Sequence, residues 1–440
     1  MNERRLKLGL GVLSERRFRS FYLARALSLL GDGVVPVALV FAVLSIEGSA
    51  TSVGIVLAAQ TVPRVALILL GGIAGDRLPR RRLMMVSDLL RFATQGCAAF
   101  LLISGHARLW HLAALMFVYG AGTAFFMPAS TGLIPQLVER DQLQQANALT
   151  NLTASSFSLL GPVLAGVLVA TVGPGSAFAI DSGSFLASAL FLLRIGPLGA
   201  VSVVPGSFLE QLRAGWAEVR SRTWLWVDGL FSALGNALTI APIFVLGPVI
   251  AKQSLGGAGA WAAIVACFGA GAIVGGATAL RLRPRRPLLI AWALLSLFCL
   301  PPALLAVPAP TAAISATALL AGLSLNFANT LWETAVQQHV PAHALSRVTS
   351  FCLFLALILT PLGYATVGPV AETIGQRPTL IGAAVWALAA SVIALSVPGV
   401  RDLRREDIGI TPPPDAIEPV DAALKPPAAL RRLRSRGRRR

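Results

Sequence analysis

Twelve long apolar stretches divide this chain of 440 residues, and they constrain its fold more than any other feature. A helix that crosses the hydrocarbon core of a bilayer needs about 20 mainly apolar residues. Segments of about that length occur at residues 20–45, 51–75, 83–104, 110–133, 147–172, 176–195, 224–251, 258–280, 287–307, 311–335, 348–371 and 377–398. The sequence therefore predicts an all-α membrane protein with 12 transmembrane helices.

The composition supports a membrane protein but carries a strong basic excess. Hydrophobic residues make up 55% of the chain and charged residues only 13%, about half the charged share of a soluble protein. The formal net charge is nevertheless +17. A basic chain can bind nucleic acid, but such a protein needs a water-soluble body. We therefore expect the lipid bilayer rather than nucleic acid as the partner, and a monomer.

The basic residues lie almost entirely in alternate loops. With the N-terminus placed inside, 31 of the 37 Lys and Arg residues fall on the inner side and three on the outer side. The remaining three, Arg25, Arg64 and Arg91, lie within apolar stretches. Because Lys and Arg concentrate in cytoplasmic loops, the bias predicts a multi-pass protein of the inner (cytoplasmic) cell membrane with both termini in the cytoplasm.

The spacing of the stretches divides the chain into two sets of six helices. The linker between them places Trp216 and Val219 on one helical face with Phe208 and Leu212, which predicts an amphipathic helix at the membrane surface. We expect a cytoplasmic tail at 1–19, a six-helix bundle at 20–195, a cytoplasmic linker at 196–223, a second bundle at 224–398 and a disordered basic cytoplasmic tail at 399–440.

The two sets of helices share an internal repeat. Residues 71–82, which follow the second stretch, resemble residues 275–286, which follow the eighth. At nearly the same offset, Gly161 and Gly166 of the fifth stretch match two glycines of the eleventh, Gly363 and Gly368. Six helices separate the copies, so both have the same orientation in the membrane. The halves are therefore predicted to be pseudo-symmetric about the membrane normal.

After the second stretch the chain resembles the major facilitator superfamily of transporters. Pro79 stands where the family signature usually has glycine, and the other signature positions are Gly72, Asp76, Arg77, Arg80 and Arg81. The resemblance implies the major facilitator fold of two six-helix bundles and a charged latch at the inner gate. Asp88 and Arg91, spaced i, i+3 in the third stretch, are expected to form a pair beside this gating motif.

A second family motif lies in the fifth stretch. Gly161, Pro162 and Gly166 match the Gly-Pro-x-x-x-Gly motif that is common in exporters, where proline bends the helix and the glycines permit close contact. Residues 30–32 (Leu-Gly-Asp) are among several that are similar to the enterobactin exporter and macrolide-efflux subgroup, the transmembrane secretion effectors. Met116 replaces the proton-relay arginine of many drug/proton antiporters.

Three charged residues inside apolar stretches are candidates for proton coupling. Asp32 lies about 12 residues into the first stretch and Arg64 about 13 residues into the second, so the two sit at a similar depth. Arg25 lies two turns before Asp32. Because charges inside a bilayer are costly, we expect Asp32 to carry the transported proton, with Arg64 or Arg25 controlling its protonation. A permanent structural ion pair is the alternative.

Aromatic and amide side chains are the candidates for substrate binding. Lipid contact or core packing would also explain the aromatic residues, and hydrogen bonds between helices would also explain the amides. No histidine, cysteine or acidic cluster has the spacing of a metal site. The candidate substrate-binding residues are Phe125, Phe126, Phe231, Asn326 and Asn329.

Together these features predict a secondary active exporter that works by alternating access. No Walker-type phosphate-binding motif occurs, so we expect a proton antiporter without a cofactor. The expected substrate is a hydrophobic or amphipathic small molecule such as a drug, a siderophore or a secondary metabolite. The alternative is a facilitator or importer of a small solute. An enzyme is disfavoured because no nucleophile, histidine and acid share one depth.

Overall fold

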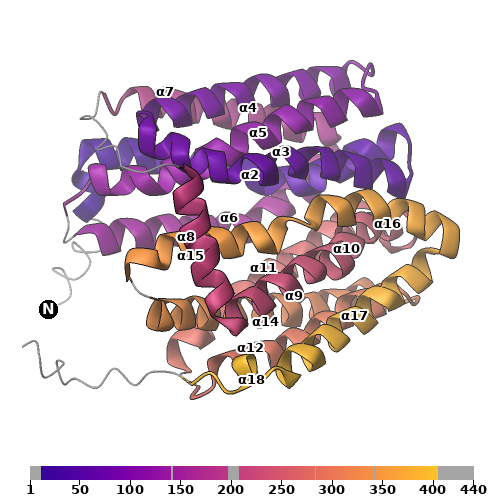
Figure 1. Ribbon diagram of the computed structural model, residues 1–440. Coiled ribbons are helices and arrows are strands. Elements are labelled where there is room, and N and C mark those ends of the chain that lie inside the picture. The colour runs from indigo at the N-terminus through magenta and orange to yellow at the C-terminus, as the bar shows by residue number, and fades with distance from the viewer. Residues whose placement is uncertain (1–10, 140–141, 197–207, 283, 341, 405–440) are drawn as a thin grey trace, which may run out of the picture. The chain divides into compact units, whose positions relative to one another are not determined.

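The computed structural model describes residues 11–139, 142–196, 208–282, 284–340 and 342–404. The regular structure in these ranges is helical, and twelve segments are long and apolar enough to cross a membrane (Figure 1). The prediction of 12 transmembrane helices is therefore confirmed. Most of the expected N-terminal tail and of the basic C-terminal tail lies outside the described residues.

The first half consists of six helices whose boundaries follow sequence signals. Pro79 immediately precedes α4, and Gly173, with a φ of 89°, separates α6 from a helix that begins with Pro174. The helix α2 packs against α6 and α7, whereas α3 packs against α5. The six helices are α2 (Arg16–Ile46), α3 (Ala50–Arg77), α4 (Arg80–Ile103), α5 (Leu109–Leu133), α6 (Leu143–Thr171) and α7 (Pro174–Leu193).

The second half contains more interrupted helices. Its first span is α9 (Thr223–Gly235), the π-helix η4 (Asn236–Ile240), α10 (Ala241–Ile250) and the π-helix η5 (Ala251–Leu255). A 3-10 turn and a proline-initiated break interrupt two later spans. The remaining elements are α11 (Ala258–Arg281), α12 (Pro287–Leu295), η6 (Ser296–Cys299), α13 (Leu300–Leu305), α14 (Thr311–His339), α15 (Ala342–Leu357), α16 (Thr360–Ile374), α17 (Gln376–Ser396) and α18 (Pro398–Arg401).

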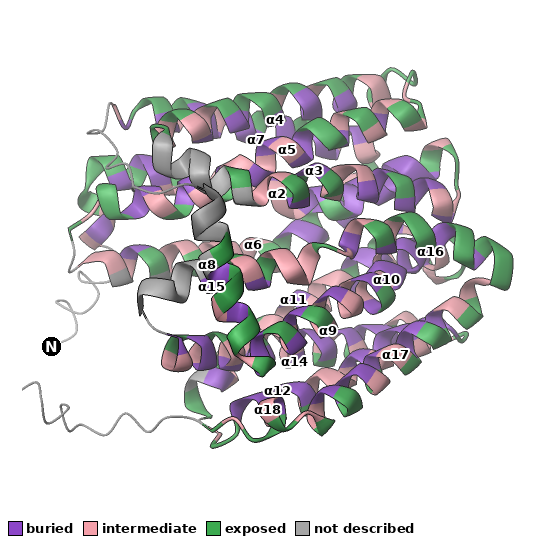
Figure 2. Cartoon of the chain, in the orientation of Figure 1, coloured by how far each residue is buried: buried purple, intermediate pink, exposed green. Residues whose placement is uncertain are grey.

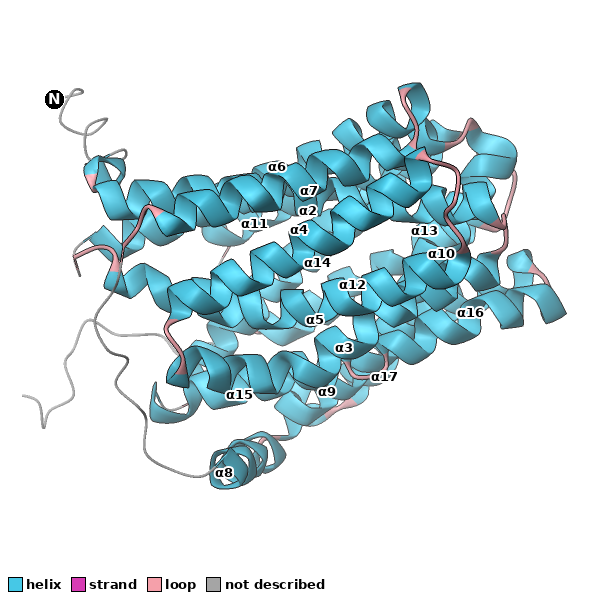
Figure 3. Ribbon diagram, turned by 90° about the horizontal axis from the view of Figure 1, so that it is seen from above, coloured by secondary structure: helices cyan, strands magenta, loops and turns pink. Residues whose placement is uncertain are grey.

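The predicted linker helix is present as α8 (Phe208–Ser221). It crosses the spanning helices in Figure 1, is seen end-on at the edge of the molecule in Figure 3, and packs against α15 and α9 of the second half. Val219 is buried, and the Trp216 ring lies 6.4 Å from the Phe351 ring of α15. The side chains of Phe208 and Leu212 lie outside the described residues. One apolar face of α8 thus contacts protein.

Glycine contacts repeat between the halves. A Cβ atom on Gly161 of α6 would lie 2.6 Å from the Cα of Gly33 of α2, and a Cβ on Gly363 of α16 would lie 2.6 Å from the Cα of Ala237. Because Gly33 and Ala237 occupy equivalent helices of the two halves, the repeated motif makes the same close contact twice. Tight backbone approach explains why both positions are glycine.

The hydrophobic core is continuous at one end of the molecule and divided at the other. We call the end at which α2 begins the inner end, after its predicted orientation, and the opposite end the outer end. At the outer end one cluster joins residues 34–44 of α2 to Leu246 of α10, Trp261 of α11 and Val367 of α16. Toward the inner end, one cluster lies within residues 12–195 and another within 219–400.

Hydrogen bonds between the halves also lie at the outer end. Thr51 donates to the Glu372 carboxylate at 2.7 Å, and the Lys252 ammonium donates to the Leu44 carbonyl at 2.5 Å. The two halves are therefore joined at the outer end.

Buried residues follow the inward faces of the helices, and exposed residues follow the outward faces (Figure 2).

Candidate functional site

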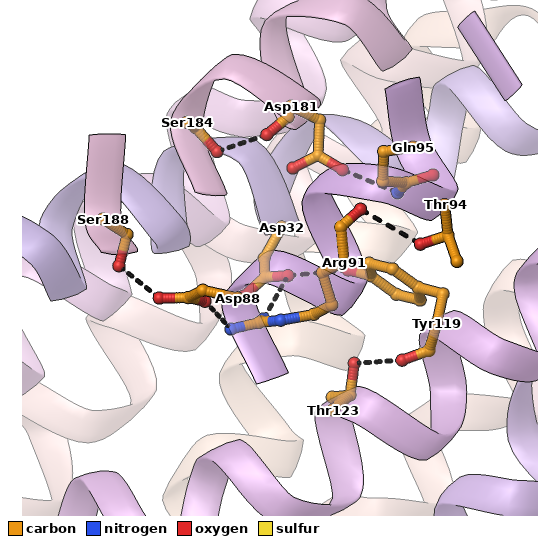
Figure 4. Close-up of polar contacts among 10 residues, drawn as sticks. All are labelled: Asp32, Asp88, Arg91, Thr94, Gln95, Tyr119, Thr123, Asp181, Ser184 and Ser188. Carbon is orange, nitrogen blue, oxygen red and sulfur yellow. Dashed lines mark hydrogen bonds and ion pairs between the residues drawn. The ribbon is translucent and has the colours of Figure 1, made fainter. Parts of the chain in front are cut away.

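A buried polar network occupies the interior of the first half (Figure 4). Arg91 of α4 is fully buried, and its guanidinium lies between two carboxylates. Nη2 donates to Asp88, and Nη1 lies 3.5 Å from Asp32 Oδ1. Asp88 also accepts a hydrogen bond of 2.6 Å from Ser188 of α7. The expected Asp88–Arg91 contact is thus present, and it extends to two further helices.

Two aromatic rings enclose the Arg91 guanidinium. Its Cζ lies 4.1 Å from the centroid of the Phe126 ring and 4.2 Å from that of Phe185. Arg25 approaches the same Phe126 ring at 5.3 Å. Such cation–π contacts stabilise a buried cation. Phe126, expected among the substrate-binding residues, therefore covers Arg91, whereas Phe125 beside it is half-buried.

Asp32 has different partners from those expected from its depth. Its Oδ1 atom accepts a 2.7 Å hydrogen bond from the Tyr119 hydroxyl of α5 and faces Arg91. Arg64 is exposed on α3, and α3 packs against α5 and α16 while α2 packs against α6 and α7. Asp32 and Arg64 lie at a similar depth but on helices with different neighbours. Arg91, rather than Arg64, is therefore the arginine that faces Asp32.

The gating motif is only partly described. The backbone of Gly72, Asp76 and Arg77 lies in the last part of α3, but their side chains lie outside the described residues. Arg80, at the start of α4, donates to the Gly132 carbonyl at the end of α5. Arg81 is half-buried beside it. Arg80 therefore ties two helices of the first half together at the inner end.

Asp181 of α7 also belongs to the buried network. The sequence did not predict its place there. Its carboxylate is fully buried and accepts a 2.6 Å hydrogen bond from Gln95 of α4. A Cβ atom on Gly31 of α2 would collide with Asp181 Oδ1 and with Ser184 Oγ, so glycine is required where α2 passes them. The available sequence signal was the polar face formed by Asp181, Ser184 and Ser188 at helical spacing.

The exporter-type motif lies where α6 meets both halves. Gly161 contacts Gly33 of α2, as described above, and Pro162 is buried inside the helix. Gly166, slightly nearer the outer end, is so close to Ala262 of α11 that a Cβ atom would collide with the alanine methyl group. The motif therefore places small residues at one contact within the first half and at another between the halves.

A cavity of about 330 Å³ opens within the second half. Its aromatic wall contains Phe231, whose ring centroid lies 5.8 Å from that of Trp292 and 6.4 Å from that of Trp386. The π-helix η4 lies along the cavity, and π-helical turns often occur at functional sites. The polar lining residues include Ser232, Asn236, Thr239, Asn329 and Ser391.

The cavity contains two of the expected substrate-binding residues, Phe231 and Asn329. Asn326 does not line it. Its amide donates to the Ala272 carbonyl of α11 at 2.7 Å. For Asn326 the structure therefore shows the alternative to substrate binding, a hydrogen bond between helices. Asn326 and Asn329 also line a groove of about 260 Å³ formed with α6 and α11.

The described residues contain no group of three or more His, Cys, Asp or Glu side chains that could hold a metal ion. The buried acids of the first half face arginine, tyrosine, serine and glutamine side chains. This arrangement can hold charges and protons inside the bilayer.

The family model of the transmembrane secretion effectors matches residues 9–421. The chain belongs to this family of major facilitator transporters. It is a transporter rather than an enzyme. The multidrug efflux pump Tap of Mycolicibacterium fortuitum is 27% identical over 398 residues, which cover 85% of this chain and 93% of Tap. Tap of Mycobacterium tuberculosis is 26% identical, covering 91% of this chain and 96% of Tap.

A third relative and two solved structures extend the comparison. Macrolide efflux protein A of Streptococcus pyogenes is 24% identical over 264 residues, which cover 59% of this chain and 65% of that protein. The nucleoside transporter NupG has a TM-score of 0.69 at 14% identity, covering 86% of this chain and 98% of NupG. A POT family transporter has a TM-score of 0.69 at 12% identity, covering 86% of this chain and 95% of the other. These structures share the fold.

Proposed function

We propose that this chain is a secondary active exporter, driven by proton antiport, for hydrophobic or amphipathic small molecules such as drugs. The aromatic cavity of the second half carries this proposal. The names of the relatives, multidrug efflux pump and macrolide efflux protein, favour the same class of substrate. The proposed setting is the bacterial cytoplasmic membrane, with a monomer whose two termini face the cytoplasm, as the distribution of basic residues favours.

The lining of the cavity supports an amphipathic substrate. Three large aromatic side chains, Phe231, Trp292 and Trp386, offer apolar contact area, and ligand pockets are typically apolar with a few placed polar groups. Ser232, Asn236 and Thr239 supply hydroxyl and amide groups along the same lining. Asn329 supplies a further polar group.

The arrangement of the core supports transport by alternating access. The halves are joined at the outer end through Thr51–Glu372 and Lys252–Leu44. The α6 and α11 helices touch at Leu159 and Gly269, whereas nearer the inner end a groove separates them. This conformation fits an inward-open transporter whose halves rock about the outer contact.

The buried network of the first half supports proton coupling. Charges inside a bilayer are expensive and commonly mark ion or proton pathways. Asp32 and Asp88 lie beside Arg91, Arg25 lies two turns before Asp32 on α2, and the Asp32 side chain is partly exposed, at 28%. We propose that this network, with Arg91 in the role first given to Arg64, couples the proton to the substrate.

The test is transport in proteoliposomes with an imposed pH gradient and a compound panel that includes macrolides and catecholate siderophores. We expect uphill movement of an amphipathic compound with opposite proton movement. Trp386→Ala should raise KM by about tenfold, since an aromatic contact contributes about 0.5–1.5 kcal/mol beyond its buried area. Trp110→Ala removes an exposed indole outside the cavity and should leave KM unchanged.

Two results would contradict the proposal in different ways. Equal KM values for the Trp386→Ala and Trp110→Ala variants would exclude the cavity as the substrate site. Equilibration of the compound without any response to the pH gradient would instead favour the alternative, a facilitator.

A further inference from the structure

The Asp181 carboxylate differs from the other acids of the network because it faces no cation at close range. It is fully buried, and among the described residues no Lys, Arg or His lies within ion-pair distance of it. Its Oδ2 accepts from the neutral Gln95 amide, and its Oδ1 has no hydrogen-bond partner. A buried, ionised carboxylate with one amide partner would be very costly.

The carboxyl groups of the network outnumber its guanidinium groups by one. Asp88 and Asp32 share the Arg91 guanidinium, and Arg25 lies nearby over Phe126. With Asp181, the described residues of this network hold three carboxyl groups but two guanidinium groups. The charged and titratable groups that interact with Asp181 across the helices packed on α7 are Asp32, Asp88, Arg91 and Tyr119. One further positive charge would make this interior neutral.

A second polar atom without a hydrogen-bond partner lies on the helix that packs against Asp181. The Ser28 hydroxyl of α2 is buried without a partner, and Ser28 shares a helical face with Gly31, which passes directly against Asp181 Oδ1 and Ser184 Oγ. A carboxylate can only accept hydrogen bonds, whereas a protonated carboxyl group has one hydrogen to donate. Protonation would also remove the negative charge of this buried group, which has no cation within ion-pair distance among the described residues.

We infer that Asp181 is the carboxyl group that binds the transported proton, whereas Asp32 serves as the partner of Arg91 and Tyr119. This inference rests on the proposed proton antiport and names its carrier. The Asp181 carboxylate takes up one proton from the outer side and releases it to the inner side, and no other bond changes. Ser184 and Ser188 continue the polar face of α7 from Asp181 to Asp88, toward the inner end.

The direct test is infrared difference spectroscopy of the purified full-length protein between acidic and alkaline buffer. The wild type should show the carbonyl band of a protonated, buried carboxyl group. Asp181→Asn, which has nearly the same shape as the protonated acid, should remove that band. Asp32→Asn should retain it. A band that persists in Asp181→Asn and disappears in Asp32→Asn would overturn the assignment.

Transport provides the second readout, in proteoliposomes with the compound that the wild type exports. One coupled proton changes apparent substrate affinity by up to about tenfold per pH unit. Asp181→Asn should bind the compound with an affinity independent of pH, exchange it across the membrane, and lose substrate-driven proton flux. Glu333→Gln, at an exposed acid of α14, should retain proton flux.

The outcomes separate this inference from the proposed function. If the wild type moves protons with the substrate and Asp181→Asn still does so, only the role of Asp181 is wrong. If the wild type shows no proton flux, proton antiport and its carrier both fail. If wild-type transport requires Na⁺ rather than a pH gradient, and Asp181→Asn abolishes the Na⁺ requirement, Asp181 binds sodium and the proton assignment is overturned.

Discussion

At the scale of residues, Arg91 organises the first half. Among the described residues it is the largest charged side chain that is fully buried, and its guanidinium contacts two acids and two aromatic rings. Arginine suits this position because its planar group can bind acids along its edge and stack against aromatic rings at the same time. Lysine has the charge but neither the fork nor the planar face.

We therefore expect Arg91→Ala to lower the free energy of unfolding by about 3–5 kcal/mol, because it leaves Asp88 buried without its cation. Arg91→Lys should recover only part of this loss. Unfolding in mixed detergent micelles measures both effects. Asp88→Asn should partly rescue Arg91→Ala, since it removes the uncompensated charge. Arg64→Ala, at an exposed arginine, is the control, and an equal loss there would refute the argument.

The partners of Asp32 and the place of Asp181 could not be predicted from the sequence. Length and polarity placed Asp32 and Arg64 at one depth, but depth does not determine the direction in which a side chain points. That direction depends on which helices are neighbours, and α2 packs against α7 rather than along α3. Asp181 was harder to assign to the network because its close partner is Gln95, a neutral residue that carries no charge signal.

At the scale of elements, the sequence was far more informative. The twelve apolar stretches correspond to the twelve spans because the bilayer imposes their length. The repeated glycines of the fifth and eleventh stretches correspond to equivalent contacts, Gly161 on Gly33 and Gly363 on Ala237. The π-helices could not be predicted in the same way, because one extra residue per turn leaves the apolar pattern of a short segment nearly unchanged.

Two glycine-to-alanine substitutions test the importance of the α2–α6 contact. Alanine at position 161 would press its methyl group against the Gly33 backbone, which cannot move aside like a flexible side chain. Gly161→Ala should therefore destabilise the protein by about 1–3 kcal/mol, the usual cost of overpacking, and reduce transport. Thermal unfolding in detergent and a transport assay measure the two effects.

The matched control is Gly183→Ala in the middle of α7, where a Cβ atom would meet nothing within 4 Å. Because alanine favours helix more than glycine does, this change should leave stability equal or higher by up to about 1 kcal/mol. If both substitutions destabilise alike, loss of glycine itself rather than the α2–α6 contact is responsible.

At the scale of the whole molecule, the two halves meet at the outer end and separate toward the inner end. The contact between α3 and α16 illustrates the outer closure. Gly54 lies against the Tyr364 backbone, and Gly368 lies against Thr51. Such small residues allow backbones to approach closely while large side chains elsewhere fill the core. The outer contact can therefore act as a pivot or as a gate, depending on whether it opens during transport.

Cysteine crosslinking distinguishes a gate from a permanent pivot. In a background without the four native cysteines, the variant T51C/E372C should react with a short, reducible crosslinker, because Thr51 and Glu372 share a 2.7 Å hydrogen bond. If the outer end must open, the crosslink should abolish transport and reduction should restore it. Unchanged transport in the crosslinked protein would show instead that these helices never separate there.

The reciprocal pair is N151C/T278C, on α6 and α11 about 13 Å inward from the contact between Leu159 and Gly269. In the conformation described here, a short reagent should not join these positions. Addition of substrate under a pH gradient should increase their crosslinking while decreasing that of T51C/E372C, because a rocking motion closes one end as it opens the other. A parallel increase at both ends would contradict rocking and indicate that the two halves approach as a whole.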